Sequence, residues 1–214
     1  MKSVFPGKLC LRVLAGALAA LLLASSAVAR TTIVCLGDSL TEGYGVAPEE
    51  SFPSLLANRL ETLGHEVTVV NAGVSGSTSA SAVSRLRWQL RGRPDLVVLA
   101  LGANDGLRGV PPAETRRNLQ AAIALAKEAG VHVVLAGMKL PPNYGPDHLR
   151  AFERIFPELA RENELPLIPF LLKGVAAKPA LNLADGIHPN PAGYRIVVEN
   201  VLETLLPLLI PESS

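Results

Sequence analysis

The chain has 214 residues, 49% of them hydrophobic, which is enough for one domain with a sizeable core and too few to indicate two. The net charge of +1 provides no field that would attract nucleic acid, and an aromatic content of 4% leaves few rings for base stacking. These values exclude a nucleic-acid-binding protein.

The first 29 residues differ from the rest of the chain. Three cations precede an uncharged apolar run at residues 13–23, and the sequence Ala-Val-Ala follows at 27–29. This order is typical of a cleaved secretory signal peptide, and the run is shorter than the ~20 residues of a membrane span. We therefore expect a mature domain of residues 30–214, periplasmic or secreted, with a net charge of −2. An uncleaved N-terminal anchor is the alternative.

The chain has two cysteines, and only one of them belongs to the predicted mature domain. Cys10 lies within the signal segment, so Cys35 would be alone after cleavage and without an internal disulfide partner. Within the run TTIVCLG, Cys35 is expected to be a buried strand residue. Nothing nearby would lower the pKa of its thiol, which argues against a catalytic cysteine.

Along the mature chain, short apolar runs alternate with amphipathic stretches. The expected strands are residues 32–36, 66–70, 96–101, 132–136 and 166–168, and the expected helices are residues 52–63, 80–90, 112–129, 147–163 and 192–206. The strands are almost continuously apolar, which is typical of strands covered on both faces. The alternation predicts an α/β fold of βαβ units: a three-layer α/β/α sandwich of about five parallel strands with helices on both faces.

Parallel sheets of this kind bind ligands just beyond the carboxyl ends of their strands. The segments after the first three expected strands read GDSLTEGYG, NAGVSGSTS and GANDGLRG. All three are rich in glycine and small polar residues. We expect the functional site to be formed by these segments.

Ser39 follows the first expected strand and allows two interpretations. It could cap a short helix by accepting a hydrogen bond from a free backbone N–H. It could also be a nucleophile, because helix N-terminal amides can stabilise an oxyanion. A nucleophilic serine needs a base, and the base needs a group that orients it. Position alone does not decide between the two.

Of the four histidines, His188 has the most suitable surroundings. Asp185 precedes it by three residues in DGIHPN, where Gly186 and Pro189 allow a tight turn. That turn could place the carboxylate against Nδ1 of the imidazole and leave Nε2 free for Ser39. The alternative is a helix-capping aspartate beside an exposed histidine.

Two further residues are candidate oxyanion donors. Gly76 has no side chain, so its N–H can approach a substrate closely, and the amide of Asn104 is a neutral donor of two protons. Each could instead be an ordinary turn or cap residue. Their placement beyond successive strands favours a shared site.

The sequence lacks the motifs of several other kinds of active site. The sequence has no G-x-S-x-G, no phosphate-binding G-x-x-x-x-G-K-[ST], and no H-E-x-x-H or paired C-x-x-C. Asp38 could ligate a metal but is interpreted as part of the loop structure. No metal and no cofactor are expected.

The motifs GDSL at 37–40, Gly76 in the second loop, GAND at 102–105 and DGIH at 185–188 resemble the four motif blocks of the SGNH, or GDSL, hydrolases. The longer stretches NDGLRG, LPPNYG and DGIHPN are similar to one branch of that family. This branch comprises bacterial periplasmic acyl-CoA thioesterase I, also described as protease I and lysophospholipase, and its arylesterase relatives.

The resemblance implies a flavodoxin-like sandwich and a role for each candidate. Ser39 would be the nucleophile, His188 the general base and Asp185 the residue that orients it. The oxyanion hole would consist of the Ser39 N–H, the Gly76 N–H and the Asn104 side chain.

The resemblance also implies where the acyl chain lies. The segment 103–110, with Leu107 at its apolar tip, would lie along the chain and could shift when substrate binds. The segment 141–146, with Pro142 and Tyr144, would form another wall.

The sequence therefore predicts a serine hydrolase that cleaves esters and thioesters through an acyl-enzyme. The expected substrates are small acyl compounds: lysophospholipids, aryl esters, short-to-medium acyl esters and acyl-CoA. We expect a monomer with no stable membrane insertion after signal cleavage. The alternatives are a carbohydrate O-acetyl esterase, which the low aromatic content disfavours, and a non-catalytic periplasmic protein that binds acyl chains or lipids.

Overall fold

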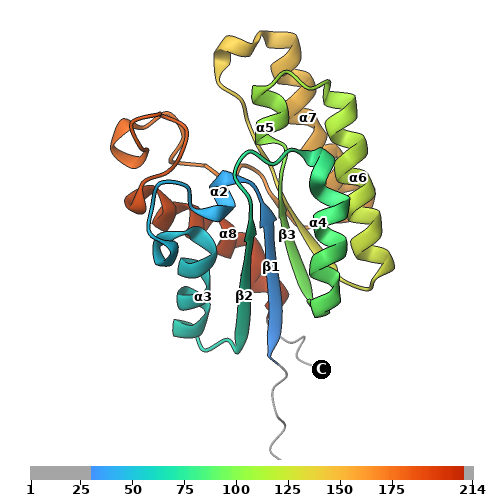
Figure 1. Ribbon diagram of the computed structural model, residues 1–214, viewed down its shortest axis with the longest axis vertical. Helices are drawn as coiled ribbons and strands as arrows, with labels where there is room; N and C mark the ends of the chain where they lie inside the picture. The colour runs from blue at the N-terminus through green and yellow to red at the C-terminus, as the bar shows by residue number, and fades with distance from the viewer. Residues whose placement is uncertain (1–29, 210–214) are drawn as a thin grey trace, which may run out of the picture.

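The structure is a computed structural model that describes residues 30–209. The predicted signal segment 1–29 and Cys10 lie outside these residues. One sheet of five parallel strands runs through the centre of the molecule in the order β2-β1-β3-β4-β5 (Figure 1). The strands are β1 (Thr31–Gly37), β2 (Val67–Gly73), β3 (Leu96–Ala100), β4 (His132–Ala136) and β5 (Leu167–Ile168).

Helices cover both faces of the sheet and complete the three layers (Figure 1). The α-helices are α2 (Ser39–Glu42), α3 (Phe52–Thr62), α4 (Ala82–Gln89), α5 (Ala103–Leu107), α6 (Pro112–Glu128), α7 (Pro146–Asn163) and α8 (Pro191–Leu209). On one face α3 packs against α8, and on the other α6 packs between α4 and α7. The predicted α/β/α sandwich with five parallel strands is confirmed.

The strand order determines which loops meet. β1 lies between β2 and β3, and its last residue, Gly37, pairs with Gly73 on one side and Ala100 on the other. The segments that follow these three strands therefore begin side by side at one edge of the sheet, as the sequence predicts. Two short helices, α2 and α5, lie at this edge (Figure 1). A short helix beside Ser39 was one interpretation of the sequence, whereas α5 forms where only a loop was expected.

The close packing of α2 on the sheet depends on a glycine at the end of β2. A Cβ added at Gly73 would lie 2.1 Å from the backbone nitrogen of Glu42, which is far shorter than any real Cβ contact. A larger residue would push α2 away from the strand end. The position of α2, and of Ser39 at its start, is thus set by backbone contact with the sheet.

The core confirms the expectation for Cys35. This residue lies fully buried in β1, and burial raises the pKa of its thiol to about 12. Such a thiol remains protonated and is shielded from reagents. Within residues 30–209, the helices are too short or too polar to cross a lipid bilayer.

Candidate active site

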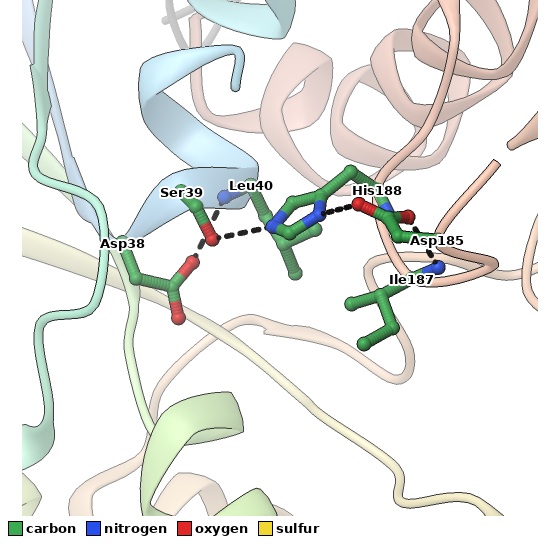
Figure 2. Close-up of polar contacts among 6 residues, drawn as sticks. All are labelled: Asp38, Ser39, Leu40, Asp185, Ile187 and His188. Atoms are coloured by element: carbon green, nitrogen blue, oxygen red, sulfur yellow. Dashed lines mark hydrogen bonds and ion pairs between the residues drawn. The ribbon is translucent and has the colours of Figure 1, made fainter. Parts of the chain in front are cut away.

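The sharp turn from β1 into α2 presents the Ser39 side chain at the edge of the sheet. The N-cap of α2 is Asp38, whose carboxylate accepts a hydrogen bond from the Leu40 N–H at 3.0 Å. The interpretation of Ser39 as the cap is therefore wrong, and Asp38 is more than loop structure. The Ser39 hydroxyl is left free and lies 2.9 Å from Nε2 of His188 (Figure 2).

The imidazole of His188 connects Ser39 to a carboxylate. Nδ1 of His188 lies 2.7 Å from Oδ2 of Asp185, while Nε2 faces the serine (Figure 2). The other carboxylate oxygen, Oδ1, accepts hydrogen bonds from the N–H groups of Ile187 at 2.9 Å and His188 at 3.0 Å. The turn that the DGIH motif predicts thus forms. It places His188 beside Ser39, which lies 149 positions earlier in the chain.

The surroundings of Asp185 keep it ionised. Desolvation is the largest single influence and raises the pKa of this carboxyl, but the N–H groups of His188 and Ile187 and the imidazole together outweigh it and lower the pKa to about 2. The aromatic ring of Tyr44 lies against the other side of the imidazole, with 4.6 Å between the ring centroids. His188 is therefore held by a carboxylate at one nitrogen and by a tilted contact with the Tyr44 ring.

Asp38 has the opposite environment. It is completely buried, and desolvation raises its pKa to about 6 although the Leu40 N–H, the Asn104 amide and His188 favour the charged form. Its Oδ2 lies 3.3 Å from Nδ2 of Asn104. Asp38 thus links the start of α2 to α5.

The two candidate oxyanion donors lie close to the serine. Gly76, with a φ of 75°, and Asn104 line the same cavity of about 280 Å³ as Ser39 and His188. The Asn104 amide also donates to the Ser77 carbonyl at 3.1 Å. Both amide protons therefore have protein acceptors, of which Asp38 is the more distant. An oxyanion would have to share or replace that longer contact.

A second cavity of about 400 Å³ adjoins the first and is mostly apolar. The two share four lining residues, Leu40, Ala103, Leu107 and Ile187. Pro142 lines the second cavity, as the resemblance implies. Tyr144 lines neither, and its hydroxyl instead donates to the Leu107 carbonyl at 3.1 Å, behind the cavity wall.

Sequence reasoning missed another part of this second cavity. Phe170, Leu172 and Ala176 line it from the segment that follows β5. No motif marks these residues, because apolar side chains in a connecting segment resemble ordinary core residues. Only the short strand β5, which directs the chain toward this edge, could have suggested their position.

Within residues 30–209, no group of three or more His, Cys, Asp or Glu side chains could hold a metal ion. The reactive groups of the site are a serine hydroxyl, an imidazole and a carboxylate, which lie beyond the carboxyl ends of parallel strands. This arrangement on an α/β sandwich is that of a serine hydrolase.

Comparison with known proteins places the chain within this class. The sequence profile of the GDSL-like Lipase/Acylhydrolase family matches residues 35–196. The chain belongs to this family and is an SGNH-type serine hydrolase.

Similar proteins cover nearly the whole chain. Esterase TesA of Pseudomonas aeruginosa is 43% identical over 197 residues, which are 92% of this chain and 98% of the relative. Arylesterase of Vibrio mimicus is 41% identical, over 86% of this chain and 92% of the relative. Thioesterase 1/protease 1/lysophospholipase L1 of Escherichia coli K12 is 37% identical, over 90% and 91% respectively. The crystal structure of TesA matches with a TM-score of 0.81 and 42% identity, covering 84% of this chain and all of that one.

Proposed function

We propose that the protein hydrolyses acyl esters and thioesters, with Ser39 as nucleophile, His188 as general base and Asp185 as the carboxylate that orients it. The observation that carries this assignment is the continuous hydrogen-bonded path from Ser39 Oγ through both imidazole nitrogens to Asp185 (Figure 2). Separations of 2.9 and 2.7 Å lie within the range for proton transfer and for holding one tautomer of the imidazole.

The reaction follows from these contacts. Ser39 Oγ attacks the acyl carbonyl carbon while its proton passes to Nε2 of His188, and the ionised Asp185 stabilises the imidazolium. The tetrahedral intermediate collapses as His188 returns the proton to the leaving alcohol or thiol, leaving an acyl-serine. A water molecule, deprotonated by the same nitrogen, then releases the carboxylic acid and restores Ser39. No step requires a metal or a cofactor.

The negative charge of the tetrahedral oxygen needs donors that are already in place. The proposed donors are the N–H of Ser39 at the start of α2, the N–H of Gly76 and the amide of Asn104. This assignment is supported by the positions of Gly76 and Asn104, which line the cavity that contains the nucleophile. Asn104 would turn one proton from Asp38 toward the oxyanion.

The adjoining apolar cavity suggests the substrate class. It opens from the catalytic cavity along Leu40, Leu107 and Ile187, so an acyl chain attached at Ser39 could extend into it. The names of the relatives include an esterase, an arylesterase and a thioesterase/lysophospholipase. We propose lysophospholipids, aryl esters and short-to-medium acyl esters as substrates, with acyl-CoA thioesters cleaved by the same chemistry. An apolar cavity suits these better than a carbohydrate acetyl ester.

We further propose that residues 30–214 act as one exported monomeric domain after removal of residues 1–29. The basic start, apolar run and Ala-Val-Ala sequence of that segment support this. Acyl-CoA is scarce outside the cytoplasm, so thioester cleavage would then be secondary in the cell.

A fluorophosphonate probe read by intact mass tests the proposal. The wild type should gain one adduct, and Ser39→Ala should gain none and lose hydrolysis of p-nitrophenyl esters. Ser75→Ala is the matched control, because Ser75 lines the same cavity but does not contact His188. It should keep the adduct. A folded wild type that forms no adduct would overturn the catalytic assignment and favour a protein that only binds acyl compounds.

A further inference from the structure

A second buried carboxylate lies beside the site and takes no part in the proposed reaction. Asp105 follows Asn104 on α5 and is only 1% exposed. It accepts hydrogen bonds from the Ser79 N–H at 2.8 Å, from the Ser79 hydroxyl, and from the Thr115 hydroxyl at 3.3 Å. The Asn118 amide in turn donates to the Ser79 hydroxyl at 3.0 Å.

These contacts join the two segments that contain the proposed oxyanion donors. Ser79 lies three residues after Gly76, in the connection between β2 and α4, whereas Asp105 directly follows Asn104. Asn104 itself donates to the Ser77 carbonyl at 3.1 Å. Two adjacent side chains of α5 thus hold the connection at two points, one on each side of Thr78.

The other side-chain contacts of the Gly76 segment lie at the exposed surface, whereas those of Asp105 are buried. The Ser75 N–H donates to the Glu42 carboxylate at 2.7 Å, and Arg108 donates to the Gly76 carbonyl at 3.0 Å.

α5 has five residues, and its N-cap is Gly102 with no side-chain hydrogen bond. Such a helix is too short to be stable alone. The connection from Val74 to Thr78 lies outside the sheet and outside any helix. The buried contacts that Asp105 and Asn104 make with this connection therefore help to set the distance between the Gly76 and Asn104 donors.

The chemistry of a buried carboxylate makes this contact a strong restraint. A polar group removed from water must be compensated by hydrogen bonds, and leaving it without them is costly. A displacement of the connection would leave the buried carboxyl oxygens without their donors. Asp105 thus penalises any movement of Ser79, and with it of Gly76, relative to α5.

We propose that Asp105 is a positioning residue for the oxyanion hole: it holds the Gly76 segment against α5 so that the Gly76 N–H and the Asn104 amide face the same point. This inference rests on the proposed roles of Gly76 and Asn104. Asp105 lines neither of the two cavities, so it would act without touching the substrate.

The substitution Asp105→Asn tests this role with little change in shape. Its amide can accept one hydrogen bond but places a donor where the carboxylate accepts another, so the contact with Ser79 loosens. We expect kcat to fall about 10- to 100-fold, less than the loss of a whole oxyanion donor, while KM stays near the wild-type value. Unchanged kcat in a folded Asp105→Asn protein would overturn the proposal.

A double-mutant cycle with Asn104→Ala separates positioning from a general loss of stability. If Asp105 acts by placing Asn104 relative to Gly76, Asp105→Asn should cost much less in the Asn104→Ala background than in the wild type. Effects on kcat that simply multiply would contradict the coupling. Both variants are assayed well below their unfolding temperatures, so that a reduced stability does not reduce kcat.

Two further variants complete the test. Thr115→Val removes the weakest contact of the same carboxylate but does not touch the Gly76 segment, so it should lower the unfolding temperature and leave kcat unchanged. Ser79→Ala removes one of the two Ser79 contacts, and it should lower kcat in the same direction as Asp105→Asn even if the latter does not fold. An active Ser39→Ala would refute the proposed function itself, whereas an inactive Ser39→Ala with normal Asp105→Asn and Ser79→Ala would refute only the positioning role.

Discussion

The two halves of the active site are built in different ways. The half that contains Ser39 and the proposed oxyanion donors rests on buried carboxyl groups, Asp38 and Asp105, whose partners lie up to 66 residues away in the chain. The half that contains His188 lies on a surface segment, and the Asp185 side chain is 37% exposed. The N–H groups that hold the Asp185 carboxylate come from residues only two and three positions further along the chain. One half therefore depends on tertiary packing and the other on a local turn.

The contrast also appears in the acidity of the two carboxyls nearest the reaction. Burial raises the pKa of Asp38 to about 6, whereas the backbone N–H groups and imidazole around Asp185 lower its pKa to about 2. Burial therefore disfavours the charged form of Asp38, whereas the hydrogen bonds around Asp185 favour its charged form and outweigh its desolvation. The Asp185 carboxylate can thus be partly exposed and still be held in one orientation, because the N–H groups that bind it are close in sequence.

The largest effect among substitutions that keep the nucleophile should come from the exposed half. Asp185→Asn can donate rather than accept at Nδ1 of His188, which favours the wrong tautomer of the base. We expect kcat on p-nitrophenyl butyrate to fall about 10⁴-fold, the scale known for this change in a serine protease triad. Asp147→Asn, which alters an exposed acid on α7, serves as the control and should have wild-type kcat. A loss below tenfold for Asp185→Asn would mean that the local turn alone orients His188.

A substitution in the buried half should lower kcat less, because three proposed donors together stabilise the oxyanion and two remain when one is removed. Asn104→Ala removes one of three proposed oxyanion donors and should lower kcat about 10²- to 10³-fold. Asn58→Ala on the exposed face of α3 is the control and should leave the rate unaltered. Steady-state kinetics on the same ester provide the measurement. A wild-type kcat in Asn104→Ala would remove this residue from the oxyanion hole.

Tyr44 tests how much the exposed half gains from packing. The centroid of its ring lies 4.6 Å from the centroid of the His188 imidazole, and the residue is 52% exposed. An aromatic contact contributes about 0.5–1.5 kcal/mol, so Tyr44→Ala should lower kcat by about 2- to 10-fold and Tyr44→Phe should lower it little. Equal losses in both variants would instead implicate the phenol hydroxyl.

The smallest effect concerns stability and has opposite signs in the two halves. The raised pKa of Asp38 means that its contribution to stability is present below about pH 4 and is lost as the pH rises through about 6. The lowered pKa of Asp185 means that its contribution is present above about pH 4 and is lost as the pH falls toward 2.

Unfolding temperatures measured by calorimetry from pH 2.5 to 8 should separate these contributions. Asp38→Asn should flatten the decline between about pH 4 and 6, and Asp185→Asn should flatten the decline below about pH 4. Identical pH profiles for wild type and Asp38→Asn would show that the buried carboxyl does not titrate in this range.

Much of the fold was predictable because its signals are local. The five strands are short, nearly continuous apolar runs, and the alternation with amphipathic segments predicts the parallel sheet. The helix α5 was not predicted, and α2 was only one of two interpretations of the segment after the first strand, because four or five residues carry no periodicity. Tyr144 was predicted on the resemblance to line the acyl site, but its hydroxyl faces the Leu107 carbonyl instead.

By itself, the sequence determined the strands, the three glycine-rich segments and the turn at Asp185-Gly186-Ile187-His188, since each depends on neighbours in the chain. Only the tertiary structure decided that Asp38 rather than Ser39 caps α2, that Asp105 faces Ser79, and that Phe170 lines the apolar cavity beside Ser39. The physical reason is that burial and long-range hydrogen bonds arise only when the sheet brings its strand ends together.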